Sequence, residues 1–287
     1  MSGNAWKERA ETMKVHHIHA LYFSPTGGTK KVITALARKL SALLHIQVEF
    51  RDLTVLENRR KVYQFDDQTL VLLAIPVYAG RIPNKLLPDL QQCIKGNHTP
   101  VIPICVYGNR SYDEALRELL MLSETTGFIP IGAATMVSQH AFSNVFANGR
   151  PNMDDISKLE AFAMKLVSQI QDSETWNAMD YDRKTLIKPY YMPLKEEHTP
   201  AKFLKAKPVT DISKCNGCGI CAQQCPMASI SLDNVVDVCG ICIKCQACVV
   251  HCPTKAKHFI DEDFLSHVRM LEATYKQPKE PEFFLSN

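Results

Sequence analysis

The first two-thirds of the chain alternate between short apolar runs and segments with helical periodicity. Residues 17–23 form an apolar run typical of a buried strand, and the helical segment 30–44 follows. Further strands are predicted at 46–52, 70–77, 101–107 and 129–137, and further helices at 85–93, 113–125 and 154–171. Because strands that alternate with helices form parallel sheets covered on both faces, the pattern predicts a doubly wound α/β sheet of five strands.

Three of the predicted strands end in loops rich in glycine and polar residues, at 24–29, 76–83 and 107–112. In a parallel sheet such loops gather beyond the carboxyl ends of the strands, where ligands bind. The first loop, Ser-Pro-Thr-Gly-Gly-Thr, leads into a helix, an arrangement that suits a phosphate group. It lacks the glycine spacing of ATP and dinucleotide loops, and a turn capped by Ser and Thr is the alternative.

Composition and charge narrow the class of protein. The chain has 287 residues, 46% hydrophobic and 22% charged, which is ordinary globular composition, and its length favours two domains. A net charge of +3 is too small to indicate a nucleic-acid partner. We expect no membrane span, because the apolar runs are too short to cross a bilayer. The N-terminal residues lack the apolar segment of a secretory signal, so we expect a cytoplasmic location.

Nine of the eleven cysteines lie between Cys215 and Cys252. They include two runs with the spacing C-x2-C-x2-C-x3-C-P, namely Cys215, Cys218, Cys221 and Cys225, then Cys242, Cys245, Cys248 and Cys252. The second run repeats the first 27 residues later, since 242 − 215 and 252 − 225 both equal 27. The repeat predicts a duplicated unit with a pseudo-two-fold axis. In a reducing compartment, clustered thiols bind metal more often than they form disulfides.

This spacing is the ligand run of bacterial two-cluster ferredoxins, in which the fourth cysteine of each run binds the other cluster. We therefore expect one [4Fe-4S] cluster at Cys215, Cys218, Cys221 and Cys252, and a second at Cys242, Cys245, Cys248 and Cys225. Zinc is the alternative metal, but zinc sites favour separated C-x2-C pairs. Cys239 is surplus to eight ligands, and we expect it to be a free thiol, with a substitute ligand as the alternative.

Two regions and a linker are expected from these patterns. The sheet domain covers residues 15–185, and the iron–sulfur domain covers 209–262. The segment between them, 186–208, contains three prolines and several lysines, which is typical of a semi-flexible linker. Residues 263–287 are predicted to form a C-terminal helical tail, because Phe264, Val268, Leu271 and Tyr275 share one helical face.

The loop at 24–29 resembles the FMN-phosphate loop of flavodoxins, and the loops at 76–83 and 107–112 resemble those that flank the flavin ring. With the cysteine repeat behind it, the chain from residue 15 to 262 resembles the flavodoxin–ferredoxin fusion proteins of anaerobes. The resemblance implies a flavodoxin-like doubly wound parallel five-stranded sheet and a small α+β ferredoxin-like domain. It also implies the cofactors FMN and two [4Fe-4S] clusters, and a role in electron transfer.

The resemblance also implies which residues bind FMN. The phosphate would be held by Ser24, Thr26, Gly27, Gly28 and Thr29, and the ring would be flanked by Pro76, Tyr78, Ala79, Gly80, Gly108 and Asn109. Tyr78 would stack on the ring, with an ordinary strand-end aromatic as the alternative. His140 follows the fifth strand and would face the flavin, a partner or solvent. No catalytic residue is predicted.

Three functions are compatible with these patterns. We expect an electron carrier that passes electrons between the clusters and FMN and that serves redox partner proteins. The alternatives are an FMN-dependent reductase of a small organic substrate, fed through the ferredoxin domain, and a regulatory protein that senses redox state. No DNA-binding motif supports the regulatory alternative, and no second glycine-rich nucleotide loop indicates direct oxidation of NAD(P)H. The oligomeric state is not predicted.

Two arginines, Arg81 and Arg110, lie in the predicted ring loops, where the first carboxylate is Asp113. A cation near the ring stabilises a reduced flavin, which carries negative charge. We therefore hypothesise that both arginines raise the flavin potential, so that electrons flow from the clusters to FMN. The alternative is that the guanidinium groups pair with helix carboxylates or point to solvent.

Overall fold

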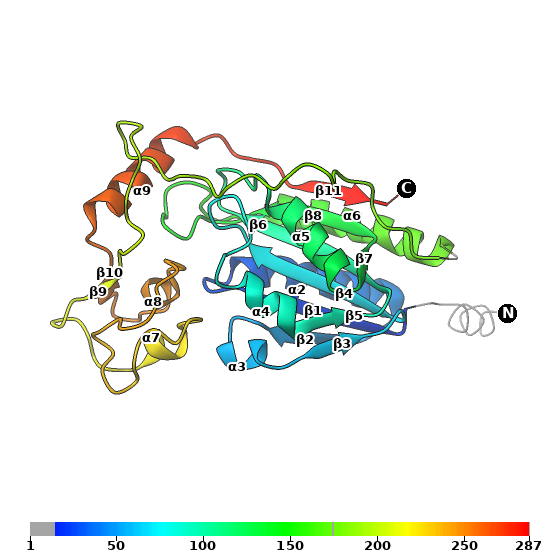
Figure 1. The fold of residues 1–287 in the computed structure, drawn as a ribbon, viewed down its shortest axis with the longest axis horizontal. Coiled ribbons are helices and arrows are strands. Elements are labelled where there is room, and N and C mark those ends of the chain that lie inside the picture. The colour runs from blue at the N-terminus through cyan, green and yellow to red at the C-terminus, as the bar shows by residue number, and fades with distance from the viewer. Residues whose placement is uncertain (1–14, 174, 287) are drawn as a thin grey trace.

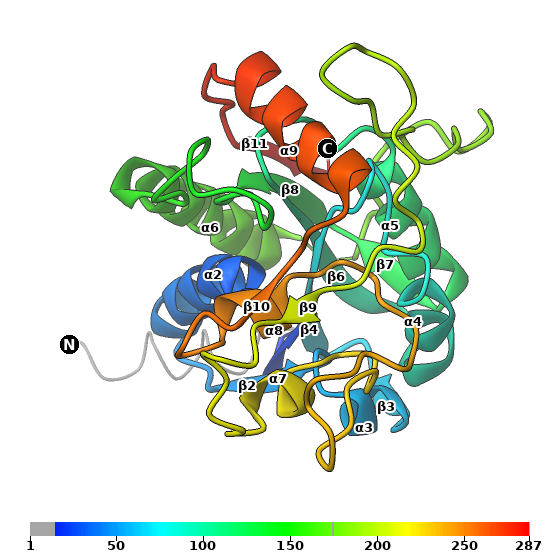
Figure 2. The same cartoon turned by 90° about the vertical axis from the view of Figure 1, so that its left-hand side faces the viewer.

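The computed structural model describes residues 15–173 and 175–286. A twisted sheet with helices on both faces forms the larger part, and a smaller unit with little regular structure lies beyond one end of its strands (Figure 1). The view along the sheet from that end shows the small unit in front of the strand ends (Figure 2). The iron–sulfur repeat is therefore placed on the edge of the sheet where ligands were expected.

Five parallel strands form the centre of the sheet. They are β1 (His17–Tyr22), β2 (Val48–Asp52), β4 (Thr69–Pro76), β6 (Thr99–Tyr107) and β8 (Gly132–Val137). Their order across the sheet is β2-β1-β4-β6-β8, and each neighbouring pair is parallel. This is the 2-1-3-4-5 order of flavodoxin-like folds, so the predicted doubly wound sheet is confirmed.

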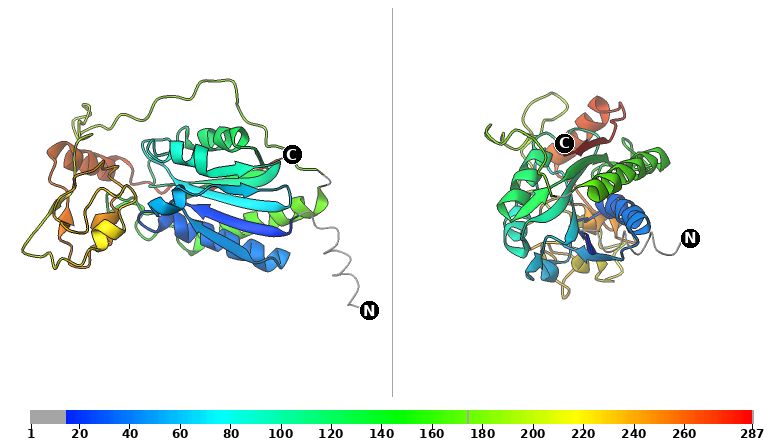
Figure 3. Two further views of the ribbon diagram at one scale, coloured as in Figure 1. Left: turned by 60° about the horizontal axis from the view of Figure 1, so that its bottom comes forward. Right: turned by 90° about the vertical axis from the view of Figure 1, so that its right-hand side faces the viewer.

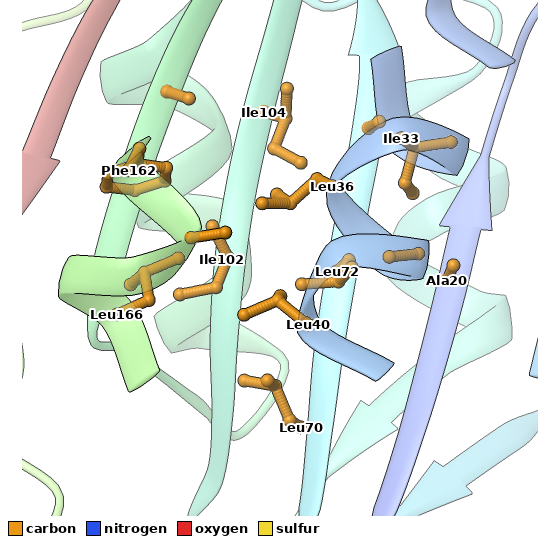
Figure 4. Packing of buried hydrophobic residues seen from close by; sticks show 14 of the residues in the cluster. Ala20, Ile33, Leu36, Leu40, Leu70, Leu72, Ile102, Ile104, Phe162 and Leu166 are labelled. Carbon is orange, nitrogen blue, oxygen red and sulfur yellow. The ribbon is translucent and has the colours of Figure 1, made fainter. Parts of the chain in front are cut away.

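The sheet is buried on both faces because helices cover each of them. Helices α2 (Gly28–Leu44) and α6 (Met153–Asp172) pack on one face, and α4 (Leu87–Cys93) and α5 (Ala115–Thr125) pack on the other. Leu36 and Leu40 of α2 meet Ile102 on β6 in the first of these layers (Figure 4). The central strands β4 and β6 are almost wholly buried, which explains why they are continuous apolar runs in the sequence.

Some local predictions need correction. The run predicted as one strand at 129–137 is divided into β7 (Phe128–Pro130) and β8, next to Pro130, which has no N–H to donate to the ladder. Short elements that the pattern did not predict also occur: α3 (Leu56–Arg59), β3 (Tyr63–Phe65) and β5 (Ile94–Gly96). Strands β3 and β5 pair only with each other, so their short sequences carry little periodic signal.

The C-terminal segment was predicted to be helical throughout, and this is only half correct. Helix α9 covers Glu262–Thr274, but β11 (Glu282–Leu285) is a strand that pairs antiparallel with β8 and extends the sheet. Phe283 stacks on Phe162 of α6 at 5.0 Å, while Phe284 packs in the cluster on the opposite face. Neighbouring phenylalanines that bury on opposite faces require a strand.

The small unit reproduces the cysteine repeat in three dimensions. Its short helices α7 (Ile220–Gln223) and α8 (Ala247–Val250) begin 27 residues apart, as the cysteines do. Strands β9 (Val209–Thr210) and β10 (Lys257–His258) pair antiparallel and close the unit. The preceding linker runs along the outside of the sheet domain before it reaches this unit (Figure 3).

Candidate functional site

A cavity of about 240 Å³ lies at the carboxyl ends of the strands, between the sheet domain and the small unit. All three predicted ligand loops contribute to its wall. The wall also includes Tyr191, Pro193 and Phe203 from the linker, Ile243 and Lys244 from the second cysteine run, and His267 and Leu271 from α9. We call this space the interdomain cavity. It is built from four separate parts of the chain.

The first loop supplies the features that a phosphate group needs. Helix α2 begins at Gly28 with no acidic residue in its first turn, so its N-terminus favours an anion. Gly27 adopts φ +92°, and the hydroxyl of Ser24 accepts a hydrogen bond from the Lys30 N–H at 2.9 Å. A Cβ on Gly28 would lie 2.2 Å from the Ser138 hydroxyl, so only glycine fits there. The residues present fit a phosphate.

The second loop places Tyr78 between the cavity and the cysteines. The N–H of Tyr78 donates to the Arg81 carbonyl at 2.9 Å, and Ala79 and Gly80 take positive φ values of +49° and +77°. Burial raises the pKa of Tyr78 well above its ordinary range, and negative charge at Cys245 and Cys242 raises it further. The tyrosine therefore lies close to the second cysteine run.

Eight of the eleven predicted cofactor-binding residues line the interdomain cavity, and the other three do not: Gly27, Gly80 and Asn109. A Cβ on Gly80 would overlap Asp113, so this glycine serves packing. The buried amide of Asn109 donates to the carbonyls of Tyr275 and Gln277, and its oxygen accepts from the Lys279 N–H. Its side chain holds the C-terminal segment, which the sequence gave no reason to expect.

The two arginines of the ring loops have different roles. Arg81 forms a two-point ion pair with Glu118 and lies over the ring of Tyr190, outside the cavity wall. Arg110 does line the cavity, where it pairs with Asp113 and lies 4.0 Å from the ring centre of Tyr191. The hypothesis that both tune a flavin is wrong for Arg81, because its guanidinium pairs with a helix carboxylate.

Two histidines face the cavity in neutral form. Burial lowers the pKa of His140 to about 3, and the neighbouring His267 and Arg110 lower it as well. Nδ1 of His140 accepts from the Phe142 N–H at 3.1 Å, which leaves its proton on Nε2. Nδ1 of His267 donates to the Leu194 carbonyl at 2.8 Å, and burial lowers its pKa too. His267 was missed because nothing local indicates that α9 packs over the cavity.

The cysteines are arranged in two tetrads, each around its own small cavity. One cavity is lined by Cys215, Cys218, Cys221 and Cys252, and the other by Cys225, Cys242, Cys245 and Cys248. These are the crossed sets expected from the sequence. In the described part of the chain, no three His, Cys, Asp or Glu side chains converge closely enough to share a single ion. Thiols spread around a cavity suit a cluster better than a single tetrahedral zinc ion.

Backbone amides support the two crossed thiols in the same way. The Sγ of Cys225 accepts from the Ser229 N–H at 3.3 Å, and that of Cys252 accepts from the Ala256 N–H at 3.2 Å, four residues on in each case. Amides directed at sulfur stabilise a charged cluster. The exposed Cys239 lines neither cavity, so the expectation of a free thiol stands as a prediction.

Two side-chain contacts join the crossed thiols to the sheet domain. The buried guanidinium of Arg59 donates to the carbonyl of Pro226, the residue after Cys225. The ring of His251, the residue before Cys252, bonds through Nε2 to the carbonyl of Pro25 at 3.0 Å. These contacts fix the small unit against the first loop and α3.

Comparison with known proteins agrees with the cysteine pattern. Residues 208–231 match the family described as "4Fe-4S binding domain". A search of the curated proteins finds no match. The chain therefore combines a sheet with flavodoxin-like strand order and a 4Fe-4S binding domain, and both parts are typical of electron-transfer proteins.

Solved structures with a similar fold include two flavodoxins. The flavodoxin of Streptococcus pneumoniae TIGR4 is 20% identical, with 53% of this chain and 98% of that chain covered and a TM-score of 0.38. For Flavodoxin 2 from Bacillus cereus the values are 13%, 53%, 99% and 0.40. The rubredoxin oxygen:oxidoreductase of Desulfovibrio gigas is 15% identical over 57% of this chain and 38% of that chain, with a TM-score of 0.38. Within the described ranges, no helix has the length and apolar character to span a bilayer.

Proposed function

We propose that this chain is an electron-transfer protein that passes electrons between two [4Fe-4S] clusters and FMN. One observation carries the proposal. Ile243 and Lys244, from the second cysteine run, line the same cavity as the three flavodoxin-like loops. They also line the cavity of the second cysteine tetrad. Only a single layer of side chains therefore separates the proposed flavin site from the proposed second cluster.

The residues of the interdomain cavity would hold FMN by complementary chemistry. The hydroxyls of Ser24, Thr26 and Thr29 and the N-terminus of α2 would bind the phosphate, and Tyr78 and Gly108 would flank the ring. When bound, FMN supplies chemistry of one or two electrons, whereas each cluster exchanges one. The linker and α9 cover the cavity and exclude water from it.

A reductase of a small organic substrate is the second candidate. The observation in its favour is the outer wall of the cavity, where Phe203, His140 and His267 form an aromatic surface with hydrogen-bonding atoms. The Nε2–H of His140 would orient a polar substrate group there. A carrier needs no such pocket, so turnover of a small molecule would decide in favour of the reductase.

Location and partners follow from the same chemistry. We propose a cytoplasmic protein, because clustered thiols and iron–sulfur ligands persist in a reducing compartment. We propose that the domains are 15–185 and 209–262 with the linker 186–208, and that other redox proteins exchange electrons with the chain. The exposed Cys218 makes the first tetrad the more accessible of the two.

The proposal is tested by anaerobic purification of the full chain, reconstitution with iron, sulfide and FMN, and analysis of both cofactors. We expect about eight irons and one FMN per chain. Iron near four per chain would overturn the two-cluster assignment, and the absence of FMN binding would overturn the flavin assignment. Stopped-flow reduction by a low-potential protein donor, with and without small acceptors, would then separate a carrier from a reductase.

A further inference from the structure

The two cysteine runs differ at positions where their backbones agree. The first run has Gly217 and Gly219 at left-handed φ values of +69° and +75°. The matching positions 27 residues later are Lys244 and Gln246, at φ +56° and +65°. Left-handed backbone costs glycine little and other residues more. The second run therefore keeps side chains at two positions where glycine would be the less strained choice.

Both side chains are buried and occupied. The ammonium of Lys244 donates to the carbonyls of Leu204 and Cys242, and its side chain lies in the wall between the interdomain cavity and the second tetrad. The amide of Gln246 donates to the Lys244 carbonyl at 3.3 Å and so supports this conformation. Gly217 in the first run is exposed and lines neither cavity. The strain thus occurs only in the run that faces the sheet domain.

The charge of Lys244 is not offset by a carboxylate. The cavity wall contains two strongly basic side chains, and the other one, Arg110, pairs with Asp113. Among the described residues, no carboxylate lies within ion-pair distance of Lys244. Its partners are carbonyl oxygens, which leave the positive charge directed at whatever occupies the cavity.

We propose that Lys244 is a flavin-binding residue supplied by the iron–sulfur domain, and that FMN binding is therefore coupled to assembly of the second cluster. The inference rests on the proposed function. FMN carries negative charge on its phosphate and, when reduced, on its ring, so a cation in the wall favours its binding. Because coupling between two binding sites is reciprocal, FMN must also stabilise the second cluster.

The decisive variant is Lys244→Gly, which installs the residue of the first run. It removes the cation and relieves the backbone strain at once, so a purely structural role and a binding role predict opposite effects. Lys255→Gly is the matched control, because Lys255 also has a left-handed φ, +54°, but is exposed and outside the cavity. Lys244→Arg tests rescue by charge.

The measurement is the dissociation constant of FMN for the anaerobically reconstituted full chain, from quenching of flavin fluorescence. We expect Lys244→Gly to raise it by about tenfold, the loss expected for one charge-assisted contact. Lys255→Gly should leave it unchanged, and Lys244→Arg should recover most of the affinity. Unchanged affinity in Lys244→Gly would overturn the inference.

The coupling is tested by the rate at which a chelator removes iron, with and without saturating FMN. We expect FMN to slow iron loss in the wild type and in Lys255→Gly, but not in Lys244→Gly, whose rate without FMN should be no faster than that of the wild type. An equal effect of FMN in all three chains would overturn the coupling. Failure of the wild type to bind FMN or iron would instead refute the proposed function.

Discussion

Arg59 is the buried side chain that ties the sheet domain to the turn after Cys225, and its removal should destabilise the protein strongly. Its side chain is 1% exposed and pairs with Asp89 at 2.7 Å. It also donates to the carbonyls of Leu53, Thr54 and Pro226. A guanidinium can satisfy four acceptors at once because its donors are fixed in a planar fork.

The expected cost of Arg59→Ala follows from these contacts. Truncation leaves two buried carbonyls without donors and removes the partner of a carboxylate, which together amount to about 3–5 kcal/mol. With a urea dependence of about 2–3 kcal/mol per molar, the unfolding midpoint should fall by about 1–2 M. Far-UV circular dichroism of the anaerobically reconstituted chain in urea measures this shift.

The neighbouring Arg60 provides the control. Its side chain is 65% exposed and pairs with the equally exposed Glu57, so Arg60→Ala should cost less than about 1 kcal/mol. Hydrogen exchange adds a local measurement, because the Ser229 amide, which donates to Cys225, should exchange faster only in Arg59→Ala. A midpoint within about 0.3 M of the wild type would refute the reasoning, since four buried bonds cannot be lost at that small a cost.

Four further predictions concern the tetrads and the cavity wall. Cys225→Ala should damage the cluster held mainly by the second run, seen by electron paramagnetic resonance; loss of the other cluster alone would disprove the crossed ligation. Arg110→Gln should lower the flavin midpoint potential in a redox titration, by no more than about 1 kcal/mol equivalent because Asp113 offsets the charge, whereas Arg81→Gln should leave it unchanged. Since His140 has its pKa lowered to about 3, the unfolded chain binds the extra proton below pH 6.5, and the free energy of unfolding should fall by about 2 kcal/mol from pH 6.5 to 5; a wild-type slope equal to that of His140→Phe would contradict this. Asn109→Ala should lower the melting temperature and speed proteolysis of the C-terminal segment, and unchanged proteolysis would show that its three bonds do not hold that segment.

The sequence predicted the parallel sheet because its central strands carry their signal locally. Strands β4 and β6 are buried on both faces, so each is a continuous apolar run bounded by polar loops. The cysteine tetrads were equally accessible, since ligand spacing is fixed by the geometry of the cluster. Both features depend on residues that are close together in the chain.

Other features depend on distant partners and could not be predicted. Arg81 was assigned to the flavin because its partner, Glu118, is 37 residues away on α5. Strand β11 has four residues, too few for a clear period, and its identity depends on pairing with β8. The role of Lys244 had a signal that was overlooked, because alignment of the two runs places it opposite Gly217.

The pairing of β11 with β8 has a consequence for the order in which the protein is completed. During synthesis, β8 leaves the ribosome before the cysteine repeat, and β11 leaves after it. The outer edge of β8 therefore lacks its final partner while the iron–sulfur domain is being made, and an unpaired edge is a template for association with other chains. Closure of this edge then follows the appearance of all eight cysteine ligands. The nascent flavodoxin-like sheet is thus most prone to aggregate during the interval in which the clusters have yet to be inserted.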